Sequence, residues 1–252
     1  MKTIVITGST RGIGLGMAEE FLKRGHQVVI SGRRQTDVDQ VVRDLSNMYP
    51  GERILGKACD VTEYAQVQAL WDASKAHFGR VDIWINNAGQ AHAITKLWDL
   101  PTELIDSIVT VNVIGQMYGV KVAVNEMLAQ GGGAIYLMEG QGSNGRVIKG
   151  LGLYGTTKRA TNFLFNALVE ELKGTPVIAG SLSPGMVVTD LLTVQKDVDP
   201  ESWERNKRIF NILAEKVETV VPKLAEEILS NQTHGKQIRL LGTLKVLWRF
   251  LT

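Results

Sequence analysis

The sequence has 252 residues, 28 basic and 26 acidic side chains with a net charge of +2, and one cysteine. This balance lacks the basic excess typical of nucleic-acid-binding proteins, and one cysteine excludes an intramolecular disulfide and fits a reducing, cytoplasmic location. No signal peptide and no run of about 18 apolar residues is present, so we expect no membrane span.

Short apolar runs alternate with longer stretches of helical spacing. The apolar runs predict strands over 3–8, 27–33, 53–61, 81–89, 131–139, 175–185 and 236–242. Helices are predicted over 12–24, 37–48, 65–78, 102–130, 154–173 and 222–229. Near-continuous apolar strands are buried on both faces, and their alternation with helices gives βαβ units. We therefore predict one α/β domain over residues 1–252, a doubly wound parallel sheet of Rossmann type with about seven strands.

Two segments depart from this alternation. Residues 186–216 form a long insertion after the sixth strand, at the edge of the sheet where α/β proteins bind ligands. Its apolar residues Trp203, Phe210 and Leu213 lie close to helical spacing, which fits either a helix on the core or a lid over an apolar substrate. The C-terminal tail, 243–252, fits a docked end segment or a peripheral contact with a membrane or partner.

A glycine-rich turn, "TGSTRGIG", follows the first strand and opens the first helix. Glycines permit a tight turn and close approach of the backbone to a pyrophosphate, and a helix N-terminus offers unpaired N–H groups. A plain turn is the alternative, but this position is the one that a nucleotide-binding loop requires. The candidate cofactor-binding residues here are Gly8, Ser9, Thr10, Arg11, Gly12, Ile13 and Gly14.

The end of the second strand indicates which nicotinamide cofactor is favoured. An acid there often holds the ribose 2′-hydroxyl of NAD, whereas arginine suits the 2′-phosphate of NADP. This chain has Arg33 and Arg34 and no acid, with Arg11 in the turn nearby. Solvated surface charge is the alternative, and we expect NADP(H) in preference to NAD(H).

Five motifs in register resemble the classical short-chain dehydrogenase/reductases. They are "TGSTRGIG", "NNAG", Asn112 in "VNVIG", "YGTTK" and "SPGMVVTD". The resemblance extends from the first strand to the run 236–242. It implies an enzyme that transfers hydride between a nicotinamide and a carbonyl or alcohol.

The resemblance implies that Tyr154 is the general acid/base and that Lys158 anchors the nicotinamide ribose. Residues four apart share one helix face, so the two side chains are predicted to be neighbours. A nearby ammonium, with the oxidised nicotinamide, favours tyrosinate and lowers the pKa of the phenol. Without the other motifs, a surface pair on an amphipathic helix would explain both residues.

Further roles follow from the same resemblance. Asn112 is expected to support a proton relay; the alternative is a polar residue at a contact between helices. The helices 102–130 and 154–173 are expected to pack against a second subunit in a homodimer or homotetramer. Asp60 and Val61 contact adenine. The remaining candidate cofactor residues are Asn87, Ala88, Gly89, Pro184, Gly185, Val187 and Thr189, the last for the carboxamide.

The serine of the family departs from its usual place. Glu139 and Gly140 occupy the positions where it normally lies, and Ser143 comes only eleven residues before Tyr154. We expect Ser143 to hold the substrate oxygen, with Gln141 and Asn144 as the other candidate donors.

The segments "MEGQGSNG", "YGTTK" and "SPGMVVTDLL" resemble the chlorophyll b reductase branch of this family. That branch implies NADPH-dependent reduction of the 7-formyl group of chlorophyll b or a related apolar aldehyde. Two alternatives remain: a reductase of another aldehyde or ketone, and a non-catalytic NADP(H)-sensing protein on the same fold. The four histidines have no metal-ligand spacing, so no metal is expected; His92 could border the substrate entrance.

Overall fold

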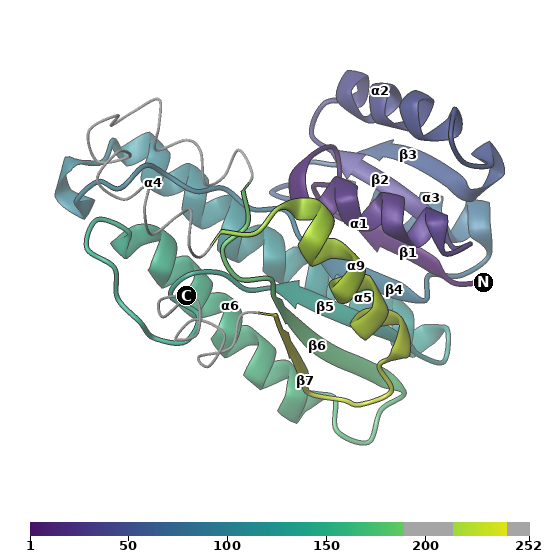
Figure 1. Ribbon diagram of the computed structural model, residues 1–252. Coiled ribbons are helices and arrows are strands. Elements are labelled where there is room, and N and C mark those ends of the chain that lie inside the picture. Colours follow the sequence, from purple (N-terminus) through teal and green to yellow (C-terminus); the bar gives the residue numbers. More distant parts are fainter. Residues whose placement is uncertain (189–213, 241–252) are drawn as a thin grey trace, which may run out of the picture.

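The computed structural model describes residues 1–188 and 214–240 (Figure 1). Within them one parallel sheet has the strand order β3-β2-β1-β4-β5-β6-β7. Its strands are β1 (Thr3–Ile6), β2 (Gln27–Gly32), β3 (Ile54–Ala58), β4 (Ile83–Asn86), β5 (Gly133–Met138), β6 (Val177–Ser183) and β7 (Lys236–Arg239). The predicted doubly wound, Rossmann-type sheet is confirmed.

Helices connect successive strands. The α-helices are α1 (Gly12–Lys23), α2 (Gln35–Ser46), α3 (Tyr64–Phe78), α4 (Thr102–Val109), α5 (Gly115–Ala129), α6 (Gly152–Glu171) and α9 (Val217–Ser230). Two 3₁₀ turns, η1 (Gly51–Arg53) and η2 (Leu97–Asp99), and a π-helical segment, η3 (Thr110–Ile114), complete the described elements.

Two helices differ from their predicted form. The expected helix 102–130 is divided by the π-helical segment η3 into α4 and α5. The last helix begins at Val217, five residues before the predicted start at Pro222. Val220 and Val221 are buried on α9, so the apolar face of the helix extends beyond the proline, which removes one backbone hydrogen bond.

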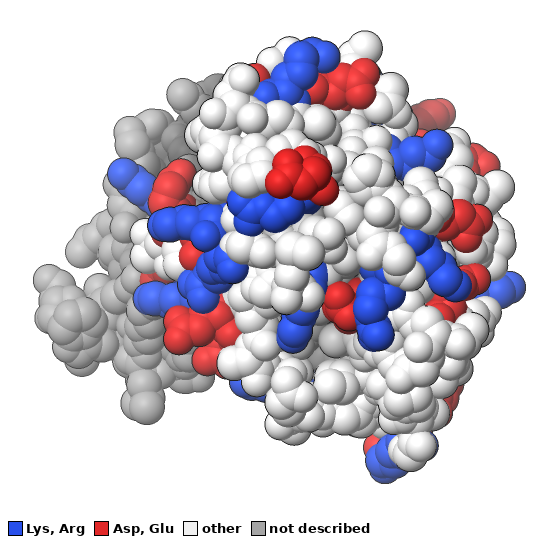
Figure 2. All heavy atoms as spheres, turned by 90° about the vertical axis from the view of Figure 1, so that its right-hand side faces the viewer, with Lys and Arg blue, Asp and Glu red and all other residues white. Residues whose placement is uncertain are grey.

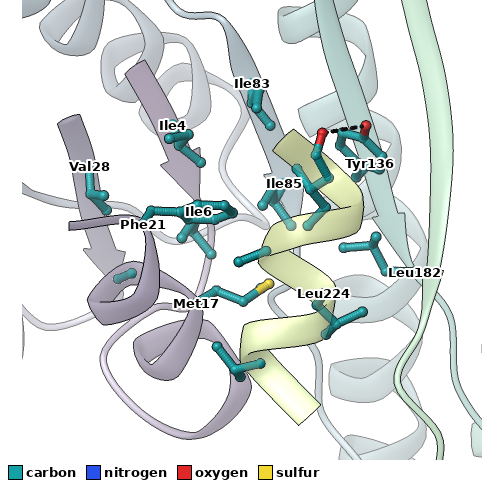
Figure 3. Packing of buried hydrophobic residues seen from close by; sticks show 14 of the residues in the cluster. Ile4, Ile6, Met17, Phe21, Val28, Ile83, Ile85, Tyr136, Leu182 and Leu224 are labelled. Atoms are coloured by element: carbon teal, nitrogen blue, oxygen red, sulfur yellow. Dashed lines mark hydrogen bonds between the residues drawn. The ribbon is translucent and has the colours of Figure 1, made fainter. Parts of the chain in front are cut away.

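Strand residues alternate between two buried cores. On β1, Ile4 and Ile6 join the core beneath α1, α2 and α9, whereas Val5 joins the core beneath α3, α5 and α6. Figure 3 shows the first core, where Met17 and Phe21 of α1 and Leu224 of α9 pack against the strands. Because side chains of a strand point alternately to opposite faces, apolar residues at consecutive positions require helices on both sides.

The strand order reverses between β1 and β4, which places the loops after these strands side by side. In doubly wound sheets this switch point is where ligands bind. The loop after β6 lies at the same edge, and there Val187 pairs with Glu215 in a parallel bridge. The two ends of the predicted insertion 186–216 are therefore adjacent, while Thr189, the insertion's apolar residues and the tail 243–252 lie outside the described residues.

By length and composition, the continuous helical stretch Thr102–Ala129 could cross a membrane. Its buried residues, including Val122, Ala123 and Met127, pack in the core with α3 and α6, as expected for a core helix of an α/β fold. On the face shown in Figure 2, acidic and basic side chains are interspersed.

Candidate active site

The glycine turn after β1 has the close packing that a phosphate-binding loop requires. Gly8 has φ +64°, and a Cβ there would lie 2.9 Å from the Cα of Ala88. A Cβ on Gly14 would lie 2.5 Å from the carbonyl oxygen of Gly8. Both positions therefore exclude a side chain, and the turn packs closely on itself and on the loop after β4.

The first turn of α1 follows this loop directly. Arg11 is the N-cap and makes no side-chain capping hydrogen bond, and the turn contains no acidic residue. N–H groups and the positive end of the helix dipole therefore point at the edge of the sheet without an internal anion, an arrangement that suits a phosphate. The predicted residues Gly8–Gly14 fit a pyrophosphate on these grounds.

Asn87 joins the two loops at the switch point. Its Nδ2 donates to the carbonyl oxygens of Thr7 at 2.9 Å and of Gly8 at 3.0 Å, and the Thr7 hydroxyl accepts from the N–H groups of Asn87 and Ala88. These bonds fix the glycine turn relative to β4. Asn87 is thus an organising residue of the predicted cofactor loop.

The arginines after β2 differ in their surroundings. Both are exposed, and Arg34 donates through Nε to Asp37 at 2.7 Å, whereas Arg33 has no ion-pair partner among the described residues. A Cβ on Gly32 would lie 2.7 Å from Cγ2 of Thr10, so the end of β2 borders the glycine turn. Arg33 is consequently the arginine better placed to meet an additional phosphate.

Asp60 and Val61 lie in the loop after β3. One carboxylate oxygen of Asp60 accepts from both the N–H and the hydroxyl of Thr62, and the Asp60 N–H donates to Gln66. Val61 is buried against Gly115. The carboxylate thus shapes the loop that precedes α3.

The loop after β6 contains three more predicted cofactor residues. Gly185 has φ +87°, Pro184 is buried, and Val187 is buried beside Glu215. This loop emerges at the same edge as the glycine turn. Thr189, the predicted carboxamide contact, lies outside the described residues.

Tyr154 and Lys158 lie on one buried face of α6, as predicted. The Nζ of Lys158 lies 5.7 Å from the centroid of the Tyr154 ring and donates to the carbonyl oxygen of Met138 at 3.1 Å. Burial raises the pKa of Tyr154 to about 12 and lowers that of Lys158 to about 8, while Glu139 acts on Lys158 in the opposite direction.

The predicted lowering of the Tyr154 pKa requires the ammonium together with the oxidised nicotinamide, so it stays a prediction for the cofactor complex; the raised pKa describes the protein by itself. Burial is the dominant influence because it disfavours the tyrosinate. A phenol that stays protonated is the form that can donate a proton to a carbonyl oxygen.

Asn112 lies fully buried inside the π-helical segment η3. Its Oδ1 accepts from the N–H of Gln90 at 2.7 Å, and its Nδ2 donates to the Gln90 carbonyl at 2.8 Å and the Thr157 hydroxyl at 3.0 Å. Asn112 therefore connects the loop after β4 to the helix of Tyr154, and single-turn π segments often occur at functional sites.

The hydroxyl of Ser143 is buried and is bonded to backbone groups. It accepts from the Gly140 N–H at 3.0 Å and donates to the Lys158 carbonyl at 3.2 Å. These bonds join the loop after β5 to α6 and give Ser143 an organising contact. The single hydroxyl proton is donated to the Lys158 carbonyl, so this arrangement leaves none for a substrate oxygen, and the substrate contact stays a prediction.

Two contacts of this site were not predicted. A Cβ on Gly140 would lie 2.6 Å from the Tyr154 hydroxyl oxygen. His92, predicted only to border the entrance, is buried, and its Nε2 accepts from the Tyr154 N–H at 3.4 Å. The position of Gly140 in place of the usual serine was the sequence signal for the first contact; spacing offered none for the second.

A nucleotide-type glycine turn beside a buried Tyr-Lys pair, on a doubly wound sheet, defines an oxidoreductase. A family model described as short chain dehydrogenase matches residues 2–199, and the chain belongs to the short-chain dehydrogenase family.

Two curated relatives share one name. The chain is 36% identical over 258 residues to "Chlorophyll(ide) b reductase NOL, chloroplastic" of Oryza sativa subsp. japonica, covering 99% of this chain and 74% of that protein. It is 38% identical over 237 residues to the protein of the same name in Arabidopsis thaliana, covering 92% of this chain and 66% of that protein, just under two thirds.

Solved structures share the fold. A 3-ketoacyl-(acyl-carrier-protein) reductase from Brucella melitensis, complexed with NADH, superposes with a TM-score of 0.81 and 27% identity, covering 97% of this chain and 98% of the other. The predicted family and its resemblance to the chlorophyll b reductases are both confirmed.

Proposed function

We propose that the protein is an NADP(H)-dependent reductase of an apolar aldehyde, with the 7-formyl group of chlorophyll b or chlorophyllide b as its substrate. The carrying observation is the buried pair of Tyr154 and Lys158 beside the glycine turn. The substrate class is supported by the likeness to two chlorophyll(ide) b reductases.

Residues on both sides of the switch point would hold the cofactor. The loop of Gly8–Gly14 and the first turn of α1 suit its pyrophosphate, and Lys158 lies where the family's ribose contact is expected. When bound, the nicotinamide supplies hydride to the carbonyl carbon.

The chain's own contribution is proton transfer and orientation. The Tyr154 hydroxyl donates its proton to the carbonyl oxygen as negative charge develops there. Lys158, as an ammonium, favours the tyrosinate that this step leaves. Asn112 holds the loop of Gln90 against α6 and so fixes the surroundings of the phenol.

NADP(H) preference is supported by Arg33, which is exposed next to the glycine turn, and by the missing acid at the end of β2.

A homodimer or homotetramer is supported by apolar side chains exposed on the helices predicted to meet a second subunit. Met117 and Leu128 of α5 are 48% and 41% exposed, and Phe163 of α6 is 75% exposed.

A cytoplasmic location remains our proposal, resting on the single, buried Cys59, and both relatives are named as chloroplastic. Peripheral membrane contact of the tail likewise remains a proposal. Fractionation of cells producing the full chain would test both.

The decisive experiment is an NADPH-consumption assay with chlorophyll b and chlorophyllide b beside simple aldehydes and ketones. With chlorophyll b or chlorophyllide b, we expect NADPH to be oxidised and the 7-hydroxymethyl product to form. NADPH oxidation that occurs only with the simple aldehydes and ketones would identify a reductase of another substrate. NADPH binding without turnover on any of them would favour a cofactor-sensing protein.

A further inference from the structure

A buried acid lies at the end of β5 that the reaction itself does not use. Glu139 is 4% exposed, and its Oε1 accepts from Nδ2 of Asn162 at 3.0 Å. Asn162 follows Lys158 by four residues on α6, so the two side chains share a face of the helix. The ammonium of Lys158 in turn bonds to the carbonyl of Met138, the residue before Glu139.

The groups around this acid explain why it can be buried. A buried carboxylate needs a charged or hydrogen-bonding partner. Burial lowers the pKa of Lys158, whereas the carboxylate of Glu139 raises it and so favours the ammonium form. Arg159 bonds to Oδ1 of Asn162 at 3.0 Å and thereby orients the amide that holds the carboxylate.

Two other titratable groups lie nearby, Tyr154 on the same helix and His92 in the loop after β4. Tyr154 faces the Lys158 ammonium through its ring, and its neutral phenol adds no charge. His92 bonds to the N–H of Tyr154 and to the Ala93 carbonyl. Neither supplies a negative charge that could replace that of Glu139.

We propose that Glu139 is a positioning residue for the reductase: its carboxylate, held by Asn162 one helical turn beyond Lys158, follows directly on the Met138 carbonyl that binds the Lys158 Nζ, and it favours that lysine as an ammonium. The proposal rests on the proposed function for its effect on rate. Its effect on Lys158 itself is independent of any substrate.

The substitution Glu139→Gln separates charge from shape. The amide keeps an oxygen that can accept from Asn162, but it removes the negative charge. A purely structural role of Glu139 predicts that the titration of Lys158 is unchanged in E139Q. An electrostatic role predicts that Lys158 loses its proton at lower pH.

The first test labels the full chain with acetic anhydride at a series of pH values. The acetylation of Lys158 is then measured by mass spectrometry of the peptide that contains it, and its midpoint is the pH at which half of the maximal reactivity is reached. In E139Q the midpoint is expected at a pH lower by about 1. An exposed acid on α6 provides the control, and Glu171→Gln should leave the midpoint in place. An unchanged midpoint in E139Q would overturn the proposal, whether or not any substrate is known.

Glu139→Asp is the second variant, in case E139Q does not fold. It keeps the charge and shortens the side chain by one methylene, so a midpoint at the wild-type pH or slightly below it is expected; a midpoint above the wild-type pH, or one lower by about 1 or more, would contradict the proposal. With a reducible aldehyde, the E139Q defect in kcat/KM should grow as pH rises from 6 to 9. A defect that is equal at every pH would assign Glu139 a structural role only.

Discussion

A Cβ at Gly140 would lie 2.6 Å from the hydroxyl oxygen of Tyr154, so a side chain here, where the family normally has its serine, would require the phenol to move. This contact brings the backbone of the loop after β5 directly against the phenol. Ser143, three residues later, bonds to the N–H of Gly140 and to the carbonyl of Lys158. The first question is therefore what the Ser143 hydroxyl contributes.

Replacing Ser143 by Ala separates an organising role from a substrate contact. Loss of two buried hydrogen bonds should lower the free energy of unfolding by about 1 to 3 kcal/mol, measured by urea denaturation. If Ser143 also holds the substrate oxygen, kcat falls while NADPH affinity is kept. Full stability together with full activity would contradict both roles. Ser230→Ala is the matched control, since that hydroxyl bonds within the exposed end of α9.

Tyr154→Phe should reduce turnover by about 100-fold or more, because the proton donor is removed while the buried ring remains. NADPH binding, followed by fluorescence, should persist. Substantial remaining turnover would refute the assignment of Tyr154 as general acid. Tyr118→Phe, on the neighbouring α5, controls for loss of a hydroxyl elsewhere.

The rate of reduction should depend on the protonation of Lys158. Burial lowers the pKa of Lys158 to about 8, so the ammonium predominates below that pH and is lost above it. The value of kcat/KM is accordingly expected to fall as pH rises through this region. Lys158→Arg, which stays charged, should be less active but should lack this decline; an identical decline in K158R would assign it to another group.

Asn112→Ala should destabilise the fold by about 2 to 4 kcal/mol, because it leaves the N–H and carbonyl of Gln90 without their buried partners. Urea denaturation measures this directly. Asn144→Ala, at an exposed loop position, should have little effect. A stability equal to that of the wild type in N112A would show that this clamp is dispensable.

Arg33→Ala tests the cofactor preference. Charge-assisted bonds to a phosphate justify an expected loss of about 10- to 100-fold in NADPH affinity, with NADH affinity nearly unchanged. Arg80→Ala, which removes an exposed arginine paired with Asp82, is the control. Equal losses for both cofactors in R33A would reject a 2′-phosphate contact.

Much of the fold followed from local patterns. Consecutive apolar residues such as Ile4, Val5 and Ile6 predict a strand covered on both faces, and both cores are present. The start of α9 was placed too late because Pro222 was taken as a helix boundary, although Val220 and Val221 pack against the core. Tertiary packing there outweighs the preference of proline for a first turn.

The site was predictable where one motif contains both partners. Tyr154 and Lys158 are four residues apart, and helix geometry alone places them together. The contacts of His92 with Tyr154 and of Asn162 with Glu139 join residues 62 and 23 positions apart. The burial that raises the Tyr154 pKa in the protein by itself was not predictable from the motif, because it depends on how loops from several strands pack over α6.

The most direct test of the central claim is hydride transfer itself. Chlorophyllide b and a panel of simple aldehydes would be incubated with NADPH deuterated at the transferable position, and the products analysed by mass spectrometry. We predict a 7-hydroxymethyl product that carries deuterium at the former formyl carbon, and no such product with Tyr154→Phe. Absence of deuterium from every product of the wild-type protein would contradict its assignment as a carbonyl reductase.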